Sequence, residues 1–285
     1  MITLPSRQNQ APVDKTRWRI SGEPFMVRCI TAMMAAVALT VSAFGAFAED
    51  AQAILAPTGK LRIGVYYGSP TSLVRDSKTG EFHGLSFDLG QELAKRLNVP
   101  FEQVSYQRIS EVLDGVIKGE VDFTVSNSTP ARAAQVSFSQ TLLTIELGYL
   151  VAATSPITTV ADVERPGLRI GVTQNSTSQG AIPKLLPNAV VVPAQNYKRG
   201  IEMLEHGEID TYATNKPTLF EMSDQMQGAR ILEGRWGEEH LAVAIPKGHE
   251  AGLEYIKQFV EDVQTSGLVA RSAEQAGLRG AVKAQ

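Results

Sequence analysis

The sequence has few cysteines, few histidines and no excess of positive charge. Its 285 residues contain one cysteine and four scattered histidines, so neither a disulfide framework nor a structural zinc site is expected. The formal net charge is −3, which argues against a nucleic-acid partner or an anionic membrane surface. We therefore expect a protein without cofactors, in which the apolar core alone maintains the fold.

A long apolar run is also missing. The best candidate, residues 30–43, follows Arg28 and holds 14 residues, whereas a span of the bilayer takes about 20. The small residues of "AFA" at 46–48 have the form of a secretory cleavage site. We therefore expect a signal peptide and leader over 1–48, cleaved near Ala48/Glu49.

Two details of this leader matter for the prediction. Cys29 precedes the apolar run instead of following it, which argues against a lipid-modified cysteine. Translation can start at Met1 or at Met26, and the sequence does not decide between them. Removing the leader changes the formal charge to −6, because the leader carries five Lys/Arg and two Asp/Glu.

An internal repeat indicates the architecture of the remaining chain. The letters "LRIGV" occur at 61–65 and again at 168–172, and each copy is typical of a strand. Later, "KGEVDFTVSN" at 118–127 is matched by "HGEIDTYATN" at 206–215, each after a helix-like stretch. Strands that alternate with helices in two similar halves predict an α/β fold with a mostly parallel sheet in each half.

Polar residues stand where the strands of both halves are expected to end. Asn127 and Asn215 each follow the repeated aspartate by five residues, and Ser176 and Thr177 follow the second "LRIGV". In open α/β sheets, ligands bind outside the carboxyl ends of the strands. Arg132 follows the first of these ends with no acid nearby in sequence, which favours an anion site.

Several motifs in order resemble the periplasmic solute-binding proteins of ATP-binding-cassette (ABC) importers, polar amino-acid type. These are "TGKLRIGV", "GLSFDLGQELAKRL", "VIKGEVD" and "TPARAAQVSFS", and the resemblance covers nearly all of 57–280. It implies the two-lobed type II periplasmic-binding-protein fold. Lobe 1 would comprise 49–152 plus 236–285, and lobe 2 would be 153–235, inserted through crossing segments near 150–155 and 231–242.

The resemblance also implies roles for individual residues. Arg132 holds the position of the arginine that pairs with the ligand carboxylate, and a guanidinium fork suits two carboxylate oxygens. The hydroxyl and backbone donors of the first lobe would come from Ser126, Ser128 and Thr129, and Asn127, at the end of its strand, is expected to bind the ligand as well. Thr129 can also cap a short helix that begins at Pro130.

In the second lobe, the resemblance places backbone N–H donors at a helix start. Ser176 and Thr177 match the family here, whereas Asn175 replaces its glycine and would need the left-handed backbone region. Tyr67 is the tyrosine expected to cover the ligand, although Tyr66 and Ile109 are alternatives. Trp236 is expected to pack near the second crossing.

Asn215 departs from the family pattern. The amino-acid binders carry an aspartate at this position, which pairs with the ligand's ammonium, and an asparagine brings no charge. We hypothesise a carboxylate without a free α-amino group, or one whose amine is bound elsewhere. Alternatively, Asn215 only completes its own loop.

The predicted function is that of a monomeric periplasmic receptor. It would close on a small carboxylate, amino-acid-like or amine-free, and deliver it to an ABC permease in the inner membrane. A second hypothesis is a periplasmic enzyme of the cyclohexadienyl dehydratase kind, with Glu146, Asp210 or Glu221 as the acid. A third is a ligand sensor or accessory protein, which genomic neighbours would distinguish from a transport protein.

Overall fold

The computed structural model describes residues 50–76 and 79–282, so the predicted leader and its cleavage site lie outside the described residues. The strands are β1 Leu61–Tyr66, β2 Val74–Arg75, β3 Phe82–His83, β4 Phe101–Tyr106, β5 Thr124–Asn127, β6 Val136–Val151, β7 Arg169–Thr173, β8 Val190–Ala194, β9 Thr211–Asn215, β10 Arg230–Ile231, β11 Gly237–Pro246 and β12 Ala281–Val282. The helices are α2 Leu85–Arg96, α3 Ile109–Ile117, α4 Pro130–Ala133, α5 Thr177–Leu185, α6 Tyr197–Glu205, α7 Lys216–Asp224, α8 Leu253–Thr265 and α9 Leu268–Gln275, with 3-10 turns at Val160–Glu164 and Glu250–Gly252.

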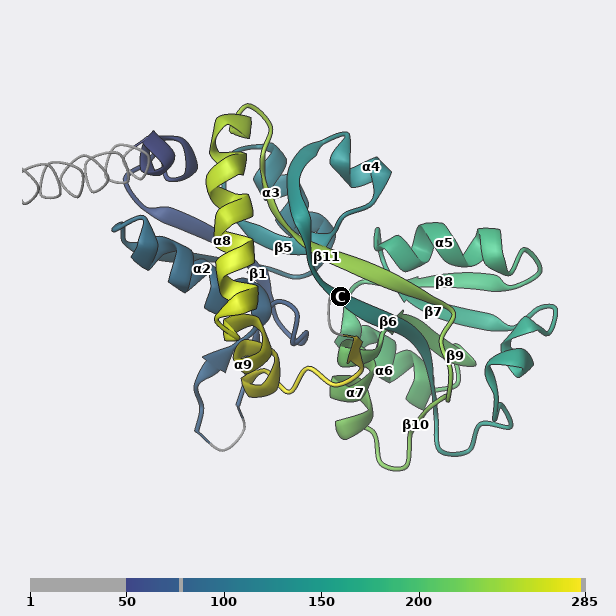
Figure 1. The fold of residues 1–285 in the computed structure, drawn as a ribbon. Helices are drawn as coiled ribbons and strands as arrows, with labels where there is room; N and C mark the ends of the chain where they lie inside the picture. Colours follow the sequence, from purple (N-terminus) through teal and green to yellow (C-terminus); the bar gives the residue numbers. More distant parts are fainter. Residues whose placement is uncertain (1–49, 77–78, 283–285) are drawn as a thin grey trace, which may run out of the picture. The chain divides into compact units, whose positions relative to one another are not determined.

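Two long antiparallel strands connect the halves of the chain. The large sheet has the order β5-β11-β6-β9-β7-β8, and β6 and β11 pair along most of their length (Figure 1). In the second half, β7 is parallel to both β8 and β9. In the first half, β1 is parallel to β4 and is bridged to Phe123, just before β5. The expected parallel strands are therefore present in both halves.

The repeated sequence letters correspond to a repeated ion pair. In the first copy, Arg62 donates from its backbone N and Nε to Asp122 Oδ2, both at 2.9 Å, and from Nη2 to Oδ1 at 2.6 Å. In the second copy, Arg169 makes the same three bonds to Asp210, at 2.8, 3.2 and 2.6 Å. The first ion pair joins the start of β1 to the segment just before β5, and the second joins the start of β7 to the segment just before β9.

Each of the long helices buries one apolar stripe. Leu89, Leu93 and Leu97 are buried along α2 and its C-cap. On α8, the buried stripe comprises Ile256, Phe259, Val260 and Val263, whose spacing places them on one face of the helix. α8 packs against β6, and α9 packs against both α2 and α8 (Figure 1).

The buried apolar residues form separate clusters in the two halves. One cluster joins the first third of the chain to β11 and the C-terminal helices, and another surrounds Tyr149, Ile170 and Ala213. Along β6, Ile145 belongs to the first cluster and Tyr149 to the second. This division is compatible with two lobes. The residue bounds of the lobes, given above from the sequence, remain a prediction.

The two Arg–Asp pairs differ in burial, and this predicts different contributions to stability. The side chain of Asp122 is 1% exposed and that of Asp210 is 30% exposed. Removing one partner of a buried pair leaves an uncompensated charge, so Asp122→Asn should lower the free energy of unfolding by about 3 kcal/mol. Asp210→Asn should cost about 1 kcal/mol, because solvent screens that pair. Urea unfolding of both variants tests this, and equal losses would contradict it.

The second pair also predicts a dependence of stability on pH. The hydrogen bond from Arg169 holds the pKa of Asp210 below its ordinary value. A lowered folded-state pKa gives stability that is complete above about pH 4, the unfolded value, and is lost as the pH falls further. The stability difference between wild type and Asp210→Asn should therefore shrink in acid. A difference that stays constant down to the acid transition would rule out this contribution.

Candidate functional site

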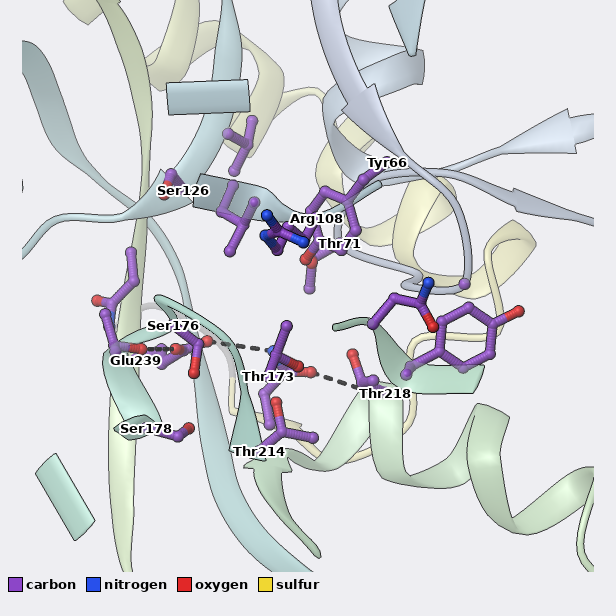
Figure 2. Close-up of a pocket in the computed structure, with 18 of the residues that line it drawn as sticks. Tyr66, Thr71, Arg108, Ser126, Thr173, Ser176, Ser178, Thr214, Thr218 and Glu239 are labelled. Carbon is purple, nitrogen blue, oxygen red and sulfur yellow. Dashed lines mark hydrogen bonds between the residues drawn. The ribbon is translucent and has the colours of Figure 1, made fainter. Parts of the chain in front are cut away.

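A pocket lies where four strands run out. Its walls include residues that end or follow β1, β5, β7 and β9, and it encloses about 670 Å³ of empty space, part of it open to solvent (Figure 2). Within each half the parallel strands end together. Because β5 and β9 run in opposite directions in the large sheet, the carboxyl ends of the two halves meet at the pocket. Many of the lining residues are polar, with hydroxyl groups from Thr71, Ser126, Ser176 and Thr218 and amide groups from Asn127 and Asn215.

Most of the predicted site residues line this pocket. The lining residues among them are Arg132, Ser126, Asn127, Ser176, Thr177, Asn215 and Tyr67. Ser128 and Thr129 are not among the lining residues: Ser128 Oγ donates to the backbone oxygen of His240 at 3.2 Å. Thr129 is the N-cap of α4, as its alternative role predicted, and Oγ1 accepts from Arg132 N at 3.3 Å.

Arg132 is held by neutral partners. Its Nη1 donates to Ser126 Oγ at 2.9 Å and to the backbone oxygen of Asn127 at 3.4 Å. No ion pair to Arg132 is present within the described ranges, and Nε and Nη2 make no hydrogen bond there. Burial lowers the pKa of the guanidinium, and the negative charge of Glu239 opposes this shift. The side chain remains a cation at physiological pH with half of its fork unused.

The opposite wall is the start of α5. Ser176 is the N-cap of this helix, and its hydroxyl accepts from Gln179 N at 3.3 Å. Asn175, just before Ser176, has a φ of 59°. The left-handed conformation that this asparagine needs in place of the family's glycine is therefore present. The helix N-terminus therefore directs N–H groups toward the pocket.

Asn215 has two hydrogen-bond roles at the start of α7. Its Oδ1 accepts from Thr218 N at 3.1 Å and thereby caps the helix. Its Nδ2 donates to Glu239 Oε2 at 3.2 Å. Because the cap occupies the oxygen, the side chain presents the amide N–H₂ to its other neighbour. The loop role considered from the sequence is present together with this second contact.

Glu239 is the acidic pocket residue that the sequence analysis did not indicate, and Thr71, Arg108, Thr173 and Thr218 are further lining residues that it missed. Glu239 lies on β11, is 7% exposed, and accepts from Thr177 Oγ1 at 2.7 Å as well as from Asn215 (Figure 2). Strand alternation predicts that either Glu238 or Glu239 faces inward, but it does not say which. Glu238 faces the other way and pairs with Arg235 at 2.6 Å.

The remaining sequence candidates divide between the pocket and the core of the second half. Tyr66, Tyr67 and Ile109 all line the pocket, and Tyr67 is 44% exposed. Trp236 packs beside Tyr149 and donates Nε1–H to the backbone oxygen of Gly148 at 2.9 Å.

The three acids considered for an enzyme do not line the pocket. Glu146 pairs with Lys216 and Arg235, and Asp210 pairs with Arg169. Burial raises the pKa of Glu221, although it lies away from the pocket near Arg279. The three hypothesised proton donors are thus engaged elsewhere.

Distant segments touch beside the pocket. Ser69 Oγ lies 3.1 Å from Thr218 Oγ1, and Arg108 Nη1 donates to the backbone oxygen of Gln195 at 3.2 Å. Gly68 lies so close to the ring of Tyr197 that a Cβ there would be 1.9 Å from Cε1. These contacts join segments before α4 to segments after β8.

Within 50–76 and 79–282, no group of three or more His, Cys, Asp and Glu side chains is arranged to hold a metal ion. In those ranges, every helix is too short or too polar to cross a bilayer.

Comparison with known proteins gives consistent matches. The family model of bacterial extracellular solute-binding proteins, family 3, matches residues 61–277. The chain is 25% identical over 193 residues to a glutamine-binding protein of Geobacillus stearothermophilus, covering 66% of this chain and 73% of that protein. It is 22% identical over 223 residues to an ABC transporter glutamine-binding protein of Bacillus subtilis, with 77% and 81% covered.

A solved structure matches over most of its length. An ancestral amino acid-binding protein, a precursor of cyclohexadienyl dehydratase, superposes with a TM-score of 0.67 and 23% identity, over 78% of this chain and 96% of that one. At this identity the likeness shows the fold alone. The predicted fold class, α/β of the type II periplasmic-binding-protein kind, is confirmed.

The backbone at Asn175 gives a local prediction. Asn175→Gly should leave the melting temperature close to wild type, because glycine adopts positive φ readily. Asn175→Val should cost about 1–2 kcal/mol, since a β-branched side chain clashes in the left-handed region. Thermal unfolding of the two variants tests the conformation at one position. Equal stability of the two would mean that residue 175 does not need a positive φ.

Proposed function

The chain belongs to the bacterial extracellular solute-binding proteins, family 3, and we propose that it binds a small carboxylate at Arg132 and delivers it to an ABC importer. Membership of this family confirms the resemblance seen in the ordered motifs and the prediction of a binding protein instead of an enzyme. The observation that carries the proposal is the partly unused guanidinium of Arg132 in a polar pocket.

The chemistry of Arg132 suits an anion with two oxygens. Ser126 and the Asn127 carbonyl orient one nitrogen, which leaves Nε and Nη2 for a bidentate contact. A partly buried cation without an acid partner is unfavourable, and an anionic ligand would compensate it.

The wall formed by α5 supports the same assignment. Ser176 and Thr177 start this helix, whose N–H groups favour negative charge. We propose that residues 49–152 with 236–285 form one lobe and 153–235 the other, and that the ligand is held where they close. The contact between Ser69 and Thr218 would belong to the closed form.

The proposed location and partner follow from the family and its relatives. The predicted leader would export the chain to the periplasm as a monomer, where its partner would be an inner-membrane permease. Because two relatives are glutamine-binding proteins, one of them named as part of an ABC transporter, amino acids are the first carboxylates to test. Their deaminated counterparts are the second set, in view of Asn215.

The test measures carboxylate binding with and without the guanidinium. A ligand at about 100 times its Kd should add roughly 2.7 kcal/mol to the stability of the wild type. Arg132→Ala should weaken binding about 100-fold, because it removes a charged contact made in the pocket. Thermal unfolding against L-amino acids and deaminated carboxylates reports both effects.

Arg165→Ala is the matched control, since Arg165 is exposed and pairs with Asp162 at 3.0 Å, outside the pocket. It should bind like the wild type. Carboxylate binding that survives in Arg132→Ala would refute the assigned role of the arginine. A carboxylate that disappears from solution during incubation would indicate turnover, and the enzyme hypothesis would replace this one.

A further inference from the structure

Glu239 is a buried carboxylate without a cationic partner. Its exposed fraction is 7%, and each oxygen accepts one hydrogen bond from a neutral side chain, Thr177 or Asn215. No ion pair to Glu239 is present among the residues that the structure describes. A carboxylate has about four lone-pair sites, so these two bonds leave further capacity for a donor.

The neighbouring charges do not cancel that of Glu239 directly. Among the lining residues, Glu239 is the one acid, and the cations are Arg108 and Arg132. Arg108 pairs with Glu111 at 2.8 Å, outside the pocket. Arg132 feels the field of Glu239 but hydrogen-bonds to Ser126 instead. The pocket therefore presents one positive and one negative group, each held apart from the other by neutral hydrogen-bond partners.

Such an arrangement is complementary to a dipolar ligand. An unpaired charge that is largely removed from water is unfavourable until an opposite charge enters, and this holds for both groups. A carboxylate alone would satisfy Arg132 and leave Glu239 uncompensated nearby. A molecule with a carboxylate at one end and a protonated amine at the other would satisfy both.

We infer that Glu239 binds the cationic group of the ligand, so that the solute is a small zwitterion carrying a protonated amine as well as a carboxylate. The inference rests on the proposed function of Arg132. It also argues against the amine-free carboxylate hypothesised from Asn215. Asn215 is neutral, but it donates a hydrogen bond to Glu239, which supplies the negative charge.

The experiment compares matched pairs of probes by isothermal titration calorimetry. Each pair is an amino acid and the same carboxylate without its α-amine: L-glutamine with 4-carbamoylbutanoate, L-histidine with imidazolepropanoate, and L-arginine with 5-guanidinopentanoate. The protein is first unfolded and refolded in ligand-free buffer. We expect an amine-bearing member to bind the wild type more tightly than its counterpart. Glu239→Gln should weaken that member about 10- to 100-fold, the loss of one charged hydrogen bond, and leave the deaminated member unchanged or tighter.

A double variant separates charge from structure. The variant combines Glu239→Gln with Asn215→Asp. The hydrogen bond of 3.2 Å between the two side chains can still form, but the amide now lies at 239 and donates, and the carboxylate lies at 215 and accepts. An aspartate can still cap α7 through its oxygen. We expect this variant to regain much of the preference for the amine that Glu239→Gln loses. Glu238→Gln, on the other face of β11, is the control and should bind like the wild type.

The outcomes distinguish the two proposals. If deaminated carboxylates bind as tightly as amino acids and Glu239→Gln changes neither, the inference fails while the carboxylate receptor stands. If Glu239→Gln tightens both members of a pair, Glu239 competes with the ligand carboxylate, and the inference is again overturned. If Arg132→Ala leaves binding intact, the proposed function itself fails, whatever the result at Glu239.

Discussion

The paired Arg–Asp contacts fix the geometry on which the pocket depends. Arg62 with Asp122, and Arg169 with Asp210, each use a backbone N–H and a guanidinium to hold two parallel segments at one end. Five residues after each aspartate, about 16 Å along an extended chain, the strand ends at an asparagine. Fixing one end of such a strand therefore sets the position of the other. This explains why the same letters recur together in both halves.

The pocket contains two charged side chains without a partner of opposite charge, which would be unfavourable in an apolar core. Neutral hydrogen bonds orient Arg132 and Glu239 without neutralising them, and each group retains unused capacity. In a low-dielectric site, such groups interact strongly with whatever charge enters. A folded chain can sustain this because the buried clusters on either side, around Leu89 and Ile170, supply the stability.

Much of the architecture could be predicted because its signals are local. The repeated strand, the apolar stripe of α2 and the left-handed Asn175 each depend on a few neighbouring residues. Arg132 also followed from an ordered motif. Glu239 could not be predicted, since strand alternation leaves two candidate glutamates and the approach of β11 to α5 is a tertiary contact. The lobe bounds have no local signal either, because β6 continues from one core into the other as a single strand.

Helix capping limits how the pocket can change its specificity. Thr129, Ser176 and Asn215 are the N-caps of α4, α5 and α7, so their side-chain oxygens are used by helix N–H groups. Replacing such a residue changes the start of a helix, at a cost of about 1 kcal/mol, as well as the lining of the pocket. Glu239 has no capping role, because it lies within a strand. A change of charge at 239 would therefore alter the electrostatics of the site while the helix starts stay in place. By this reasoning β11, and not the caps, is where the preference of the pocket for charge is set most independently of the fold.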